Sequence, residues 1–63
     1  MRNVPTARVT LIRTSGVVSV VRQQEPGELP LWTIHVRGER PIYVALSLRD
    51  ADRVSDYWIG ATA

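Results

Sequence analysis

The chain has 63 residues, no cysteine and a formal net charge of +2. This length fits one small domain, and without cysteine the chain has neither a disulfide framework nor a thiolate zinc site. Arginine interrupts the apolar stretches well before the roughly 20 residues that a membrane-spanning helix needs. The sequence therefore predicts a single soluble domain, residues 1–63, in the cytoplasm and without a membrane partner.

The first hairpin is predicted over residues 7–14 and 17–23. Apolar and polar residues alternate around Leu11 with the period of two that a pleated strand requires. Ser15 and Gly16 are expected to form a two-residue turn, because glycine readily adopts the positive φ of tight hairpin turns. That turn pairs Leu11 with Val20. The apolar strip expected on the other face of this hairpin contains Ile12, Val17 and Val21.

The second hairpin is predicted over residues 31–37 and 41–47. It follows a loop over residues 23–30, in which two prolines and a glycine interrupt any strand.

The register of the second hairpin is predicted from its apolar residues. A three-residue loop over residues 38–40 pairs Ile34 with Val44 and aligns the apolar side chains of both strands on one face. In this register His35 lies across from Tyr43 on the opposite face of the sheet. That opposite face is the expected contact surface.

A helix is predicted over residues 48–59. Ser47 is placed to cap its first turn, the acidic Asp50 favours the start of a helix, and Gly60 is placed to end it. The apolar stripe expected to pack on the sheet contains Leu48, Ala51, Val54, Ser55 and Trp58. The predicted fold is therefore α+β: a four-stranded antiparallel sheet of two hairpins followed by one C-terminal helix packed on one face (ββββα).

The sequence contains no group of residues typical of a catalytic or metal site. His35 is the only histidine. Asp50 and Asp52 point about 200° apart on a helix, so they cannot bind one ion, whereas Asp52 and Asp56 share a face beside arginine. We therefore expect no enzyme activity, no cofactor and no metal.

The leading functional hypothesis is a small protein-binding module that docks on a larger complex. Chains of this size are common among accessory and inhibitory proteins of phages and mobile elements. We therefore expect a protein of that kind. The residues expected to contact the partner are His35, Tyr43, Arg37, Ile12, Asp52 and Asp56.

The alternative hypothesis is a nucleic-acid-binding regulator that uses the basic first hairpin. Residues 1–24 contain four arginines and no acidic residue, and arginines interleaved with aromatic residues can contact phosphate and stack on bases. The expected contacts are Arg8, Arg13, Arg22 and Arg37. A sheet of this size followed by a helix also resembles in topology the arm-binding domains of tyrosine recombinases. A homodimer formed by pairing exposed strand edges is a third hypothesis.

Overall fold

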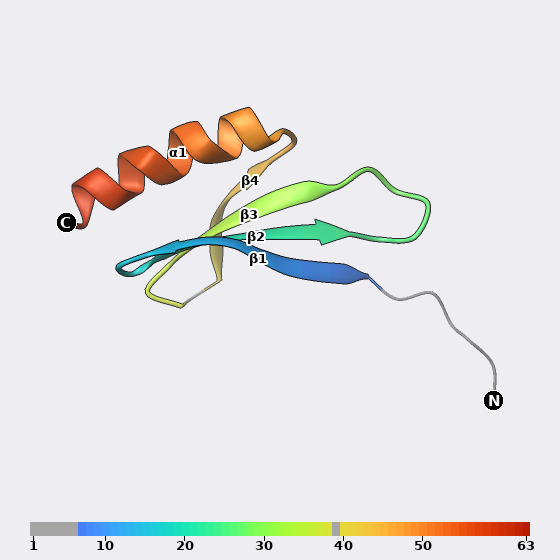
Figure 1. Cartoon of the computed structure of the whole chain (residues 1–63), viewed down its shortest axis with the longest axis horizontal. Coiled ribbons are helices and arrows are strands. Elements are labelled where there is room, and N and C mark those ends of the chain that lie inside the picture. The colour runs from blue at the N-terminus through green and yellow to red at the C-terminus, as the bar shows by residue number, and fades with distance from the viewer. Residues whose placement is uncertain (1–6, 39) are drawn as a thin grey trace.

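The computed structural model describes residues 7–38 and 40–63 of the chain. Four antiparallel strands form one open sheet in the order β1-β2-β3-β4, and a single helix follows the last strand (Figure 1). The elements are β1 (Arg8–Ser15), β2 (Val18–Gln24), β3 (Leu31–Val36), β4 (Pro41–Ala45) and α1 (Leu48–Ala61). The predicted ββββα architecture is confirmed.

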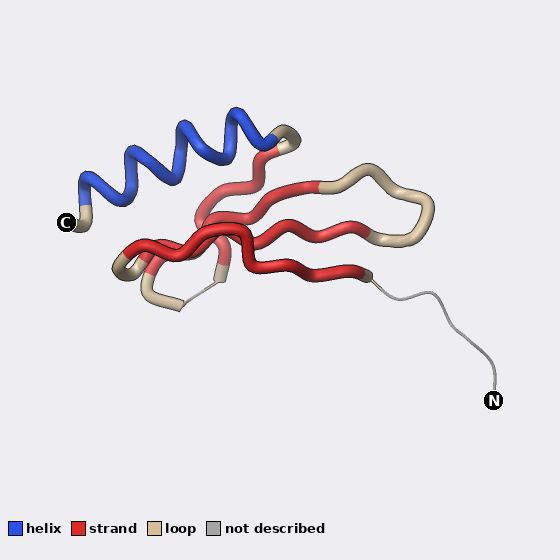
Figure 2. The backbone as a smooth tube through the Cα atoms, viewed as in Figure 1, coloured by secondary structure: helices blue, strands red, loops and turns tan. Residues whose placement is uncertain are grey.

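The helix covers one face of the sheet and leaves the other face without a covering element among the described residues. Figure 2 shows α1 over the end of the sheet that carries the β1–β2 turn, while the β2–β3 loop extends away from the helix at the other end. Helix α1 contacts β2, β3 and β4. We call the face turned away from α1 the outer face.

The core lies between α1 and the central strands. Ile34 in β3 is completely buried and is the largest of the fully buried side chains. The other buried apolar residues are Val18, Val20, Ala45, Ala51 and Val54, with Trp32, Val36, Tyr43, Trp58 and Ile59 packed around them. Each large apolar side chain removed from water contributes about 1.5–3 kcal/mol. Because the core is small, every buried position matters for the stability of the fold.

The helix begins as predicted and ends later than predicted. The Asp50 amide donates a 3.1 Å hydrogen bond to Ser47 Oγ, which makes Ser47 the N-cap. Gly60 does not end the helix, which continues to Ala61. Thr62 is the C-cap instead, and its amide and its hydroxyl both donate hydrogen bonds to the Trp58 carbonyl, at 3.0 Å and 2.7 Å. The prediction that Leu48 belongs to the buried stripe is wrong, since its side chain is exposed.

The register predicted for the first hairpin is wrong, because the turn lies one residue later. Ser15 pairs with Val18, so the turn contains Gly16 and Val17, with Gly16 at φ +60°. Glycine at this first turn position is typical of a type II′ hairpin turn. A β-bulge at Ile12 then shifts the register again, so that Leu11 pairs with Val21 and not with Val20.

The register predicted for the second hairpin is also wrong. Ile34 pairs with Tyr43, and a second bulge, at Ile42, lets His35 pair with Pro41. Of the predicted loop over residues 38–40, Glu39 lies outside the described residues. Tyr43 therefore faces the helix, whereas Ile42 and Val44, which were expected in the core, are exposed.

The register separates the charged side chains of the sheet from an uncharged outer face. Cross-strand partners share a face. The outer face contains a central row of Leu11, Val21, Thr33 and Val44, flanked by a row of Val9, Gln23 and Leu31 and a row of Thr14, Ser19, His35 and Pro41. None of these residues is Asp, Glu, Lys or Arg, whereas the strand arginines Arg8, Arg13 and Arg22 lie on the helix side.

Replacing Ile34 with alanine should lower the free energy of unfolding by about 2–5 kcal/mol, because it leaves a cavity in the centre of the core. Chemical denaturation followed by circular dichroism measures this change. The matched control is Leu29→Ala, at a side chain that is 87% exposed, which should change stability by less than about 0.5 kcal/mol. Equal effects of the two substitutions would contradict the assignment of the core.

Candidate functional site

A shallow groove lies between β1 and α1 on the helix side of the sheet. It has a volume of about 480 Å³ and is lined by Ile12, Arg13, Leu48, Asp52 and Asp56. The three helical residues are four positions apart and therefore form one stripe along α1. The groove brings together three residues that the sequence predicted as partner contacts: Ile12, Asp52 and Asp56.

The bulge in β1 accounts for the position of Ile12. As the extra residue of the bulge, Ile12 has no direct partner on β2, and bulges commonly redirect a side chain in this way. Ile12 was expected to share an outer strip with Val21, but it lines the groove beside the helix instead. Ile12 is 42% exposed and Leu48 is 46% exposed, so the groove presents two apolar side chains to solvent.

Arg13 joins β1 to the helix at one wall of the groove. Its Nη1 atom lies 2.8 Å from Asp56 Oδ1 and donates a 3.1 Å hydrogen bond to Ser55 Oγ. Ser55 is fully buried and its hydroxyl donates to the Asp52 carbonyl, so its polar atoms are satisfied. Because the guanidinium is committed to Asp56 and Ser55, Arg13 is less suited to binding a phosphate than the sequence suggested.

Tyr43 belongs to a different contact, between β4 and the first turn of α1. Its hydroxyl donates a 2.6 Å hydrogen bond to Asp50 Oδ2, and Arg53 Nε donates a 3.1 Å bond to Asp50 Oδ1. The hydrogen bond from Tyr43, followed by that from Arg53, lowers the pKa of Asp50 below its ordinary value of 3.8. The bond to Asp50 also raises the pKa of Tyr43.

His35 and Arg37 lie apart from these contacts, and the predicted pairing of His35 with Tyr43 is wrong. His35 is on the outer face, with its Nε2 atom 3.0 Å from Thr33 Oγ1. Arg37 lies in the β3–β4 turn at φ +61°, a conformation that few residues other than glycine adopt. Its backbone amide donates a 2.7 Å hydrogen bond to the Val17 carbonyl.

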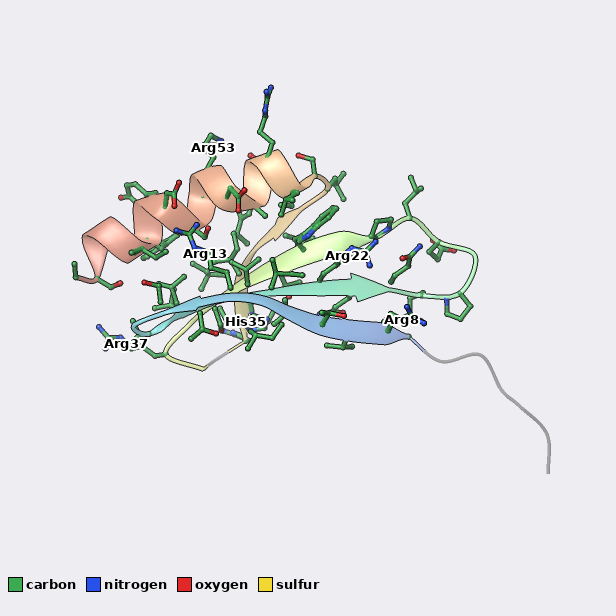
Figure 3. All side chains as sticks on the ribbon, in the orientation of Figure 1. Arg8, Arg13, Arg22, His35, Arg37 and Arg53 are labelled. Atoms are coloured by element: carbon green, nitrogen blue, oxygen red, sulfur yellow. The ribbon has the colours of Figure 1, made fainter. Side chains whose placement is uncertain are left out.

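Two of the four arginines predicted to bind nucleic acid lie near one end of the sheet. Figure 3 shows Arg8 and Arg22 toward the end that carries the β2–β3 loop, Arg13 beneath the helix, and Arg37 at the opposite end. The Arg22 guanidinium lies over the Trp32 ring, 5.7 Å from its centroid, and donates a 3.2 Å hydrogen bond to Gln24 Oε1. We call the group of Arg8, Arg22, Gln24 and Trp32 the basic end.

The structure therefore divides the predicted site residues among several surfaces. Leu48 is a groove residue that the sequence reasoning missed, because it was assigned to the core. Its position at the first turn of the helix was a usable signal, since a residue there lies at the margin of the surface that the helix covers.

Comparison of the chain with family models, curated proteins and solved structures found no match. Within residues 7–38 and 40–63, no group of three His, Cys, Asp or Glu side chains is placed to hold a metal ion. In the same residues, no helix has the length and apolar character needed to cross a membrane.

The Tyr43–Asp50–Arg53 contact predicts a dependence of stability on acid. Because the pKa of Asp50 is lower in the folded chain than its ordinary 3.8, its stabilising contribution is complete above that pH and is lost as the pH falls through the folded value. Tyr43→Phe removes the largest cause of this shift. The variant should therefore be less stable than wild type at neutral pH, and the difference should shrink in acid.

Urea denaturation midpoints measured from about pH 7 to about pH 3 test this expectation. The control is Tyr57→Phe at the second described tyrosine, which is exposed on α1 and should follow wild type throughout. A difference between wild type and Tyr43→Phe that stays constant into acid would contradict the assigned role of Asp50.

Proposed function

We propose that the chain is a small protein-binding module that docks on a larger protein complex through the groove between β1 and α1. The observation that carries the proposal is the meeting of two exposed apolar side chains, Ile12 and Leu48, with the carboxylates of Asp52 and Asp56. Apolar contacts bordered by charged groups are typical of protein interfaces. In this proposal the chain acts in the cytoplasm as an accessory or inhibitory protein of the phage or mobile-element type.

The charges of the groove define the kind of partner that fits it. Two carboxylates and the single guanidinium of Arg13 leave the groove one negative charge. Asp56 is paired with Arg13, while Asp52 forms no salt bridge with another described residue. The matching segment of a partner is therefore an apolar side chain next to lysine or arginine, since opposite charges favour the correct encounter.

Capture experiments with the immobilised full-length chain test this proposal. After nuclease treatment of a host lysate, wild type should retain a protein at low salt and less of it at high salt. Asp52→Arg and Ile12→Glu should each reduce that capture at least tenfold, because they place a like charge or a buried charge against the partner.

The matched control is Glu28→Arg, which makes the same change of charge as Asp52→Arg at an exposed loop position and should capture as wild type does. Circular dichroism verifies that each variant is folded. Equal capture by wild type, Asp52→Arg and Ile12→Glu would show that the groove is not the docking surface.

The basic end supports a second candidate, a nucleic-acid-binding regulator. Arg22 and Arg8 lie on the same face of the sheet, and Arg22 already stacks on Trp32. Proteins that bind single-stranded nucleic acid use this combination of cationic and aromatic side chains. Arg13 and Arg37 do not join them, because one is paired with Asp56 and the other lies at the opposite end.

Fluorescence anisotropy with a labelled single-stranded oligonucleotide tests the second candidate. Two phosphate contacts predict a slope of about −1.4 in a plot of log affinity against log salt concentration. Arg8→Ala combined with Arg22→Ala should weaken binding strongly, whereas Arg49→Ala and Arg53→Ala together, with the same loss of charge on α1, should have little effect. No binding at low salt would eliminate this candidate.

A further inference from the structure

Among the residues that the structure describes, the outer face is uncharged, and three of the four residues in its central row are apolar. Its central row crosses all four strands, from Leu11 through Val21 and Thr33 to Val44. Leu11 is 62% exposed and Val44 is 52% exposed. In Figure 3 the side chain of His35 lies on this side of the sheet, opposite the helix. Exposed apolar side chains on both edge strands of one sheet face are typical of an interaction surface.

Three polar side chains of this face, those of Gln23, Thr33 and His35, are already bonded to one another. Gln23 Nε2 donates a 3.3 Å hydrogen bond to Thr33 Oγ1, and that oxygen lies 3.0 Å from His35 Nε2. Thr33 also donates to the Val21 carbonyl at 3.4 Å and is only 4% exposed. Covering the face therefore leaves these three groups with partners, which removes part of the cost of burying polar atoms.

The edges of the sheet are poorly suited to pairing with another strand. Edge strand β1 is interrupted by the bulge at Ile12, and edge strand β4 has five residues, begins with Pro41 and is bulged at Ile42. Bulges, proline and short length are features by which proteins block pairing at sheet edges. This observation argues against the homodimer through strand edges that the sequence suggested and leaves the face as the surface to cover.

A second copy of the chain matches this face in charge. Under two-fold symmetry each surface meets itself, so a charged surface would bring like charges together. The outer face avoids this cost because none of the strand residues described on it is Asp, Glu, Lys or Arg. A charged partner would find no complementary group here, unlike at the groove.

The size of the face sets the expected strength of the contact. Four strands about 4.8 Å apart and three rows about 6.8 Å apart give about 400 Å² per copy, or about 800 Å² for two copies before surface relief is counted. This area lies below the roughly 1,200–2,000 Å² of stable specific interfaces and in the range of weak, transient contacts. The contact should therefore form and dissociate within the concentration range accessible in solution.

We propose that the chain forms a homodimer by packing the outer faces of two sheets against each other, as the two layers of a β-sandwich do. The dimer adds a second apolar layer to a domain whose own core is small. Because the groove lies on the helix side, the two grooves of the dimer face away from each other and both remain accessible. The proposal does not rest on the function assigned to the groove.

Light scattering over a concentration series of the full-length chain tests the proposal. The mass should rise from 7.1 kDa toward twice that value as concentration increases. Leu11→Glu places a charge in the interface and should raise the concentration needed for dimers at least tenfold. Tyr57→Glu, which makes the same substitution at a 68% exposed side chain on α1, should dimerise as wild type does.

Cross-linking provides a test that does not depend on the stability of Leu11→Glu. The chain contains no cysteine, so Val21→Cys introduces a single thiol at the centre of the outer face. A short bifunctional maleimide should link two copies of Val21→Cys but not of Tyr57→Cys. In a dimer formed through β1 edges the same thiols would lie three strand spacings apart, about 14 Å. This distance is beyond the reach of a short cross-linker.

Three results would overturn the proposal: a wild-type monomer at all concentrations, a dimer unaffected in folded Leu11→Glu, or no cross-linking of Val21→Cys. If wild type is a monomer and the Asp52→Arg substitution still reduces capture of the partner protein, the dimer is wrong and the proposed function remains in place.

Discussion

The bulge in each edge strand determines which side of the sheet its side chains occupy. Because side chains alternate along a strand, one inserted residue exchanges the faces of all residues beyond it. In β1 the bulge brings Ile12 beside the helix while Leu11 stays on the outer face. In β4 the bulge at Ile42 lets Tyr43 face α1, where it binds Asp50. Both the groove and the uncharged outer face follow from these two irregularities.

The strand arginines extend the cover that a single short helix gives to its side of the sheet. Arg22 lies along Trp32 toward the end of the sheet that carries the β2–β3 loop (Figure 3), and Arg13 connects β1 to Asp56 of the helix. The apolar stems of arginine can cover apolar surface while the guanidinium remains near water. The basic character of the first hairpin therefore has a structural explanation: Arg13 and Arg22 contribute to the fold whether or not they also bind a partner.

The sequence predicted the elements well and their register poorly. Alternation, the glycines of the turns and the cap at Ser47 are local signals, so the strands, the helix start and the ββββα order followed from them. A bulge leaves no such signal, because Ile12 and Ile42 are ordinary strand residues. The site was predicted in part: Ile12, Asp52 and Asp56 meet in the groove and His35 lies on the outer face as expected, but Tyr43 faces the helix and not the outer face.

The hydrogen bond between the Arg37 amide and the Val17 carbonyl connects the two hairpin turns at one end of the sheet. A longer or altered turn there would disturb both hairpins at once. The β2–β3 loop at the far end has local bonds, such as that between the Glu28 amide and the Glu25 carbonyl, and loop tips of this kind tolerate insertion. A fluorescent label or an affinity tag is therefore best introduced between Glu25 and Glu28, where the added chain leaves the paired turns undisturbed.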